Sequence, residues 1–533
     1  STRLRKVSLE QSLMATTNGD KHGPCHEQNG SRIEESSTMP MELESDEHVI
    51  VSEPDHVHYL GVLPLSMIVF YNVSGGPFGI EEAVRSAGFF LSILGFCIMP
   101  FVWSVPEALI TAELGSTYPE ASGGVAWVEE AFGSVAGWQA GYLGWIAGAT
   151  DNAIYPVLFL DYVFQMWTSA ENGGISDNFR FMLLSLTSIG LGFLNWLGLN
   201  VVGNMTIVIG LLSMAPFVIM VLIGMFKVDP SRWREVPTTT VDGQDVSDQG
   251  MWAVFTSGVI LWRPLLNSLF WNLNSYDATA SYSAEVRDPG YVLPRALMWG
   301  VVIMTAGYIF PILVAIGATD SEPEDWVDGY LTTAAEQIGG KWLGAWVVFA
   351  AGVSNIGMFQ AELSADAFQL MGMAERGFVP KIFATRSRHG TPTYGIILGV
   401  AVIVAMGSFN LEQLIEMLNF NYALALLLEY GAFMRLRIAK PEVHRPFRIP
   451  LGTVGSGIFL SFPVIGILII LSMASYMTMV FSLGINLAGL LIFYFYRGTS
   501  FSLRGCCSYS KVPVDNPTTV EPSDEVSGLR HID

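Results

Sequence analysis

Long apolar segments dominate the sequence between residues 60 and 496 and constrain its fold more than any other feature. A hydrophobic stretch of roughly 20 residues can cross the hydrocarbon core of a bilayer as a helix. Only 14% of the residues are charged, against roughly 25% in soluble proteins. We therefore predict an all-α polytopic membrane protein with twelve transmembrane helices, at approximately 60–84, 90–113, 136–166, 180–198, 203–226, 262–284, 296–318, 341–372, 393–408, 416–434, 457–474 and 478–496.

The two ends of the chain differ in composition from this central part. Residues 1–57 and 501–533 are polar and show no apolar periodicity, which is typical of segments that cannot form a packed core. We predict a disordered acidic tail at 1–57, a transmembrane domain at 58–500 and a second disordered tail at 501–533. No secretory leader is expected, and the four cysteines exclude a disulfide framework.

Flanking charges predict the orientation of the helices. Fourteen Lys and Arg residues follow the sixth, eighth, tenth and twelfth segments, whereas seven flank the opposite ends. The acidic loop between Asp320 and Asp328 lies on the side with fewer basic residues. Because cytoplasmic loops carry the excess of Lys and Arg, we predict that both tails are cytosolic.

Carboxylates lie inside the predicted spans, and we find no Lys, Arg or His deep inside any of these spans. A lone carboxylate in hydrocarbon costs several kcal/mol unless it is protonated, hydrated or paired with a cation. For Glu107 and Glu113 we favour a structural hydrogen bond near the cytosolic end of their span, and for Asp161 and Glu429 a place near a helix end or facing water. We expect three others, which have polar neighbours deep in their spans, to line a cavity: Asp151, Asp277 and Glu362. The positive charge that neutralises these carboxylates is then supplied by the substrate, by a proton or by both.

Two spans are interrupted in the middle. The first contains the run Ser74-Gly75-Gly76-Pro77-Phe78-Gly79, which lowers helix propensity and removes a backbone donor. The sixth contains the polar run from Asn272 to Asp277, whose side chains compete with the helical hydrogen bonds. Paired broken helices five spans apart are typical of an inverted repeat, and unwound backbone at the midplane can bind a ligand.

Three motifs in order carry a family resemblance that covers residues 60–496. They are the break at Ser74–Gly79, the loop Ala112–Gly124 and the run Met373–Pro380, which continues with Phe383-Ala384 and Gly390-Thr391-Pro392. The sequence resembles the amino acid/polyamine/organocation (APC) superfamily of secondary transporters. Through Trp271–Asp277 and Glu285–Pro289 it is similar to plant polyamine uptake transporters, also described as L-type amino acid transporter homologues. The resemblance implies a LeuT-like 5+5 inverted repeat with broken helices 1 and 6 plus two extra helices, alternating access, and proton-coupled uptake of polyamines.

Positions can also be carried over from the bacterial arginine/agmatine antiporter branch of that superfamily. This comparison implies that Asp277 handles substrate or protons, that Trp271 is a gating tryptophan and that Asn152 lies near a ligand contact. Glu362 stands where that branch has an aromatic residue facing the substrate. The exchange favours a ligand with an additional positive charge.

The resulting site prediction combines the breaks with the intramembrane acids. Asp277 and Glu362 are the predicted proton-coupling residues. No catalytic residue, metal or cofactor is expected. The predicted substrate-binding residues are Ser74, Gly75, Gly76, Asp151, Asn152, Trp271, Asn272, Asn274, Tyr276, Asp277, Glu362 and Tyr422.

The predicted partners follow from the same site prediction and family resemblance. They are a polyamine such as putrescine, spermidine or spermine, protons and the lipid bilayer. The net charge of -21 disfavours nucleic acid. Residues 167–179 contain no cysteine for a disulfide-linked heavy chain. The expected location is the plasma membrane, with an internal membrane as the alternative.

Two other functions stay open at this point. An L-type amino acid exchanger would hold the substrate carboxylate with backbone amides freed between Ser74 and Gly79. A transporter-like nutrient sensor would bind a ligand and recruit partners through its tails without useful flux. An enzyme is disfavoured, because the sequence has no Walker motif, no metal-spaced His/Cys cluster and no placed Ser/His/Asp arrangement.

Overall fold

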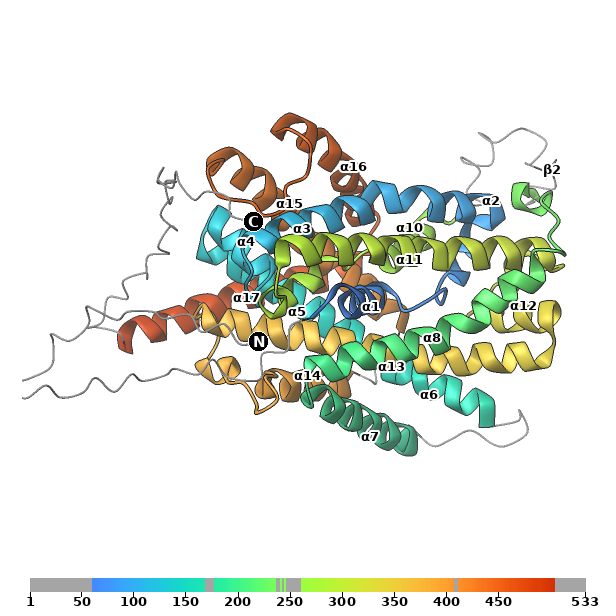
Figure 1. Ribbon diagram of the computed structural model, residues 1–533, viewed down its shortest axis with the longest axis horizontal. Helices are drawn as coiled ribbons and strands as arrows, with labels where there is room; N and C mark the ends of the chain where they lie inside the picture. The colour runs from blue at the N-terminus through green and yellow to red at the C-terminus, as the bar shows by residue number, and fades with distance from the viewer. Residues whose placement is uncertain are drawn as a thin grey trace, which may run out of the picture. The chain divides into compact units, whose positions relative to one another are not determined.

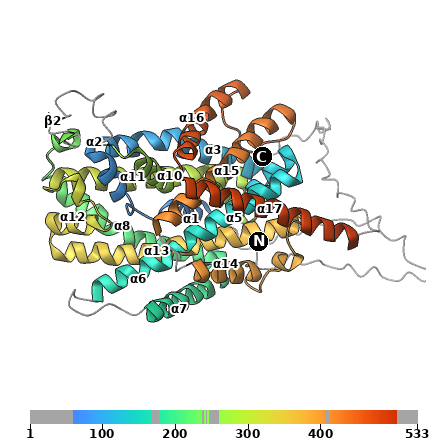
Figure 2. The same cartoon turned by 180° about the vertical axis from the view of Figure 1, so that it is seen from behind.

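The computed structural model describes residues 60–167, 177–235, 240–241, 244–245, 260–406 and 411–503. The predicted tail at 1–57 and all but the first three residues of the tail at 501–533 lie outside these ranges. Within them, β1 (Thr240–Val241) and β2 (Gln244–Asp245) form a two-residue antiparallel pair, and the regular structure is otherwise helical (Figures 1 and 2).

The first predicted span is divided by the glycine-rich run. Helix α1 (Val62–Val73) ends at Ser74, and α2 (Glu81–Met99) begins after Gly79. Gly75, Gly76 and Gly79 all have positive φ, a region that glycine enters without steric cost. A second kink, at Gly88 of α2 with φ 77°, separates this span from the next. That next helix continues through the π-turn η1 (Pro100–Ser104) and α3 (Val105–Thr117).

The sixth predicted span is divided in the same way. Helix α10 (Trp262–Leu273) and the 3₁₀ helix η4 (Asp277–Glu285) are separated by three residues. The two breaks touch, because the Asn272 side-chain amide and the Ser268 hydroxyl donate to the Gly79 carbonyl at 3.1 Å and 3.0 Å. The non-helical turn of the first break therefore contacts the last turns of α10, almost 200 residues away in the sequence.

The remaining helices surround this pair. Helix α13 packs against α5, α6, α8 and α14 and is the most buried of the long helices. Shorter helices that the apolar pattern does not predict, α4 and α12, connect the long ones. The bounds are α4 (Gly124–Phe132), α5 (Ser134–Asn152), α6 (Ile154–Trp167), α7 (Asp177–Trp196), α8 (Leu199–Gly224), η2 (Arg232–Arg234), α11 (Pro289–Ala318), η5 (Pro323–Asp325), α12 (Tyr330–Gly339), α13 (Lys341–Glu375), η6 (Lys381–Ala384), α14 (Thr393–Met406), α15 (Leu411–Ala439), α16 (Thr453–Ser472) and α17 (Tyr476–Leu503).

Helix length and apolar surface identify a membrane protein. In the described ranges, 7 helices are long and apolar enough to cross a membrane, and α1 and α14 are apolar but shorter. Large apolar side chains such as Leu186, Ile189 and Phe193 of α7 are more than half exposed. Because an apolar surface of this extent is costly in water, we conclude that the chain is a polytopic membrane protein.

Candidate functional site

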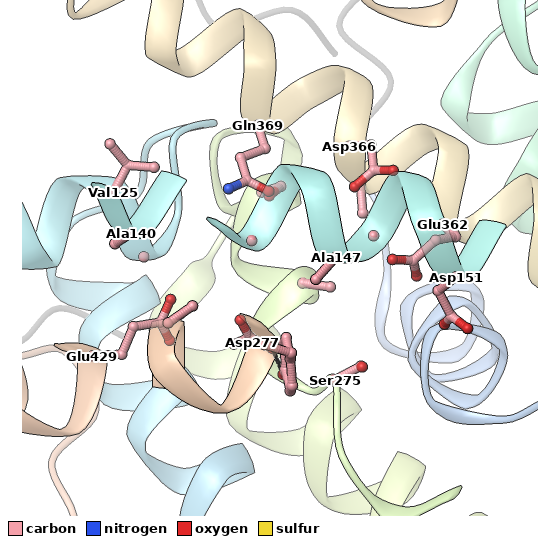
Figure 3. A pocket seen from close by; sticks show the side chains of 18 of the residues that line it. Val125, Ala140, Ala147, Asp151, Ser275, Asp277, Glu362, Asp366, Gln369 and Glu429 are labelled. Carbon is pink, nitrogen blue, oxygen red and sulfur yellow. Dashed lines mark hydrogen bonds between the residues drawn. The ribbon is translucent and has the colours of Figure 1, made fainter. Parts of the chain in front are cut away.

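A cavity of about 40 Å³ lies between α5, α13, α15 and the break that joins α10 to η4. Its wall contains five carboxylates, contributed by four elements: Asp151, Asp277, Glu362, Asp366 and Glu429 (Figure 3). All except the partly exposed Asp277 are at least nine-tenths buried. None of the five forms an ion pair with a Lys or Arg of the described ranges. The cavity is therefore strongly acidic and, in this conformation, holds only a few waters.

Small residues on α5 make room for these acids. Ala140, Gly144 and Gly148 line the cavity at intervals of four residues, which places them on one face of the helix. A Cβ added at Gly148 would lie 2.9 Å from Oε1 of Glu362 and would also collide with Asp366. The glycine at position 148 thus leaves space for the two carboxylates that face it.

The acids of α5 and α13 differ in their hydrogen bonding. Asp151 accepts hydrogen bonds from the Tyr155 hydroxyl at 2.7 Å and from the Trp271 indole N–H at 3.0 Å. Glu362 Oε2 and Asp366 Oδ2 are buried with no hydrogen-bond partner in the described structure. An unsatisfied buried carboxylate oxygen is costly, so this pair of side chains is suited to a cationic donor.

Asp277 belongs to a separate cluster around Tyr422. The Tyr422 hydroxyl donates to Asp277 and lies 3.1 Å from Oε1 of Glu107. That oxygen of Glu107 also accepts from the backbone N–H groups of Tyr276 at 2.6 Å and Asp277 at 3.3 Å. A tyrosine has one hydroxyl proton, so the two carboxylates compete for it unless one of them is itself protonated.

Four of the predicted binding residues line the cavity: Asp151, Asp277, Glu362 and Tyr422. The other eight are not among the residues that line it. Trp271 reaches Asp151, as described above, and Asn274 ends α10 with its side-chain N–H₂ unpaired. Asn152 and the Tyr276 hydroxyl are buried without a hydrogen-bond partner in the described ranges.

The residues of the first break serve to connect the two broken helices. Ser74 and Tyr308 are hydrogen bonded through their hydroxyls, and Tyr308 donates to Asn272 at 2.8 Å. The Gly76 carbonyl accepts from the Ser74 hydroxyl at 2.9 Å, and the Gly75 carbonyl accepts from Ser354 of α13 at 2.6 Å. These contacts hold both breaks against α11 and α13.

Two cavity acids were missed by the site prediction. Asp366 lies four residues after Glu362, and therefore on the same helical face, which was a usable signal. Glu429 was expected near a helix end or facing water. Helix α15 instead continues ten residues beyond it, to Ala439, so that Glu429 is buried and lines the cavity.

Glu113 forms a contrasting buried site on α3. Its carboxylate accepts from Arg437 Nε at 2.9 Å and Nη2 at 2.5 Å and from the Ile449 N–H at 2.8 Å, and Arg445 Nε lies 3.3 Å away. The structural hydrogen bond expected for Glu113 is confirmed by the Ile449 N–H, which belongs to the loop after α15, whereas its pairing with Arg437 was not expected. Helix α15 is longer than predicted, and it carries Arg437, whose side chain is 1% exposed.

The part of the chain that matches known proteins includes all the helices that line the cavity. A model of the amino acid permease family matches residues 60–496. The polyamine transporter PUT1 of Oryza sativa subsp. japonica is 41% identical over 439 residues, 82% of this chain and 78% of that protein. The polyamine transporter RMV1 of Arabidopsis thaliana is 39% identical over 438 residues, 82% of this chain and 85% of that protein. The large neutral amino acids transporter small subunit 2 of Homo sapiens is 24% identical over 408 residues, 74% of this chain and 72% of that protein.

Proposed function

Because the chain belongs to the amino acid permease family, we propose that it is a secondary transporter that takes up polyamines by alternating access and couples their uptake to protons. The family and its transporter relatives indicate a transporter rather than an enzyme. The observation that carries the choice of substrate is the cavity, in which five carboxylates have no basic partner among the described residues. A substrate with several ammonium groups supplies the missing charge.

The unpaired oxygens of Glu362 and Asp366 make these two residues the main ammonium site. Asp151 adds a third carboxylate on the facing helix α5. The aromatic rings of Tyr422, which lines the cavity, and Trp271, which donates to Asp151, pack on the methylenes of the substrate or interact with its cations. Since the cavity volume is only about 40 Å³, it has to widen to admit a polyamine, as alternating access requires.

The cluster of Asp277, Tyr422 and Glu107 supports proton coupling. Its two carboxylates share one tyrosine hydroxyl, so a proton that binds there relieves their competition. Asp277 also lines the cavity, where an entering ammonium group changes the field that the proton experiences. We assign the coupling proton to Asp277, and we keep Glu362 as the second proton-coupling residue.

The proposed architecture has twelve spans in a LeuT-like 5+5 inverted repeat, with both termini cytosolic in the plasma membrane. The contact between the two broken helices supports it. Cysteine labelling from outside the cell tests the orientation at two positions. Labelling of position 324 and protection of position 440 is expected, and the reverse pattern overturns the topology.

Reconstitution of the full chain in vesicles tests the function. Uptake of radiolabelled putrescine, spermidine and leucine is measured with and without an imposed pH gradient. We expect polyamine accumulation that depends on the gradient. Absence of polyamine uptake together with robust leucine exchange identifies an amino acid exchanger. Ligand binding without any flux identifies a sensor.

The amino acid exchanger is the second candidate because of the human relative. It would need free backbone N–H groups at the first break. The N–H groups of Ser74 and Gly75 donate to the Phe70 carbonyl, however, and that of Gly79 donates to Glu81 at 3.0 Å. Three donors of the first break are therefore occupied in this conformation.

A further inference from the structure

Glu429 is the cavity acid that the proposed mechanism leaves unused. Its side chain is 7% exposed and lines the cavity, and it makes no hydrogen bond or ion pair within the described part of the chain. Figure 3 places Glu429 at one end of the pocket, near Val125 and Ala140, and Asp151 at the other end. The cavity thus has an acid at each end.

The basic residues around this end of the cavity already have other partners. Arg437 binds Glu113, Lys440 binds Glu130, and Arg376 binds Glu120 and Glu129. None of these cations neutralises Glu429. A buried carboxylate without a counter-ion is costly, and the cavity is the space from which a cation can reach it.

Gly124, the first residue of α4, makes room for this carboxylate. A Cβ at position 124 would collide with the carboxyl group of Glu429. Gln369 of α13 also lines the cavity and is labelled in Figure 3 between the two ends. The Glu429 end is therefore a polar recess bounded by small residues.

The spacing of the lining residues along α5 fits a long polyamine. At a rise of about 1.5 Å per residue along α5, Ala140 lies about 12 Å from Gly148, which faces Glu362 and Asp366, and about 16 Å from Asp151. An extended chain advances about 3.3–3.6 Å for every three bonds. On that scale the terminal nitrogens of putrescine, spermidine and spermine are separated by about 6, 11 and 15 Å.

We propose that Glu429 binds the distal ammonium group of a long polyamine whose other end is held by Asp151, Glu362 and Asp366. The proposal rests on the proposed function and adds the basis of its substrate selection. A diamine is too short to reach both ends, so Glu429 contributes little to its binding. Triamines and tetraamines gain a second anchored charge, and the site prefers them.

Equilibrium binding tests this proposal without any coupling gradient. The dissociation constants of putrescine, spermidine and spermine are measured on the purified full-length protein and on Glu429→Gln. We expect the constants for spermidine and spermine to rise about tenfold, which corresponds to about 1.4 kcal/mol, and the constant for putrescine to change by less than about twofold. Glu442→Gln, at an exposed loop position after α15, serves as the matched control and leaves all three constants unchanged.

Two further variants separate charge from folding. Glu429→Asp keeps the charge and should retain most of the preference for the longer amines. Gly124→Ala keeps Glu429 but crowds its carboxylate, so it should weaken spermidine selectively. If Glu429→Gln does not fold, these two variants carry the test.

The outcomes distinguish this inference from the function on which it rests. Equal weakening of all three amines in Glu429→Gln, or no weakening of any, overturns the length selection while the polyamine transporter stands. If the unaltered protein binds none of the three amines, the proposed function fails and the inference fails with it.

Discussion

Glu113 and the cavity acids are buried to a similar degree in neighbouring helices, yet their surroundings differ. Glu113 is enclosed by Arg437, Arg445 and a backbone N–H, and every partner comes from the protein. Glu362 and Asp366 each keep a buried oxygen without a hydrogen-bond partner in the described structure. The comparison teaches that burial of an acid does not by itself mark a binding site; in the cavity, burial is combined with the lack of a cationic partner among the described residues and with an open space beside the carboxylates.

The first prediction concerns the cluster in which Arg437 and Arg445 neutralise Glu113. Glu113→Gln leaves Arg437 and Arg445 buried beside each other without a carboxylate. Removing one partner of a buried ion pair costs about 3–5 kcal/mol, so the melting temperature should fall steeply. The control is Glu130→Gln, which removes the partner of Lys440 in a half-exposed pair and should cost about 0–1 kcal/mol. Equal stability of the two variants would show that the Glu113 cluster contributes nothing to folding.

The second prediction concerns the acid that links the cavity to Tyr422. Asp277→Asn preserves the shape of the side chain but removes the carboxylate that competes for the Tyr422 proton. We expect accumulation of spermidine under a pH gradient to disappear, with transport reduced to equilibration. Size-exclusion chromatography in detergent should show a folded protein. Uptake by the variant with the same pH dependence as the unaltered chain removes Asp277 from the coupling role.

The third prediction concerns Glu362, a cavity acid that has no cationic partner in the described structure. Glu362→Gln removes a buried charge that has no internal cation in the described structure. Spermidine affinity should fall about tenfold, that is by about 1.4 kcal/mol, and much more than the affinity for a monovalent amine. Thermal stability should be kept or increased, because no protein partner is lost. Unchanged spermidine binding with reduced stability assigns Glu362 a structural role instead.

Local patterns made part of this fold predictable. Runs of apolar residues locate helices such as α8, α11 and α13 to within about seven residues at each end. The glycines of the first break, and the polar run in the sixth span, are likewise local signals. Helices α4 and α12 have no long apolar run and were missed. This omission mattered, because α4 contributes Gly124 and Val125 to the cavity.

Which acids meet in one cavity depends on how the helices pack against one another. Local sequence patterns do not reveal this packing. The Glu362 and Asp366 pair follows from helical spacing alone. Glu429 could not be placed, because the predicted span ended at residue 434 while α15 runs to Ala439. The same error hid Arg437 and left Glu113 without its partner in the prediction. Small errors at one helix end therefore changed the interpretation of two buried acids.

The last prediction tests whether one added Cβ, at position 148, disturbs the cavity acids. In Gly148→Ala the added carbon would lie 2.9 Å from Glu362 and would also press against Asp366, so these carboxylates would be displaced from each other. Alanine has a higher helix propensity than glycine by about 1 kcal/mol, and this gain should offset most of the steric cost in stability. Polyamine affinity should still fall about threefold, or about 0.7 kcal/mol, because the ammonium site is distorted. The control is Gly190→Ala on α7, where a Cβ meets nothing within 4 Å. It should gain stability without any change in binding. If the two variants behave alike in melting temperature and in spermidine binding, the carboxylates move freely away from α5, and Gly148 is not needed to seat them.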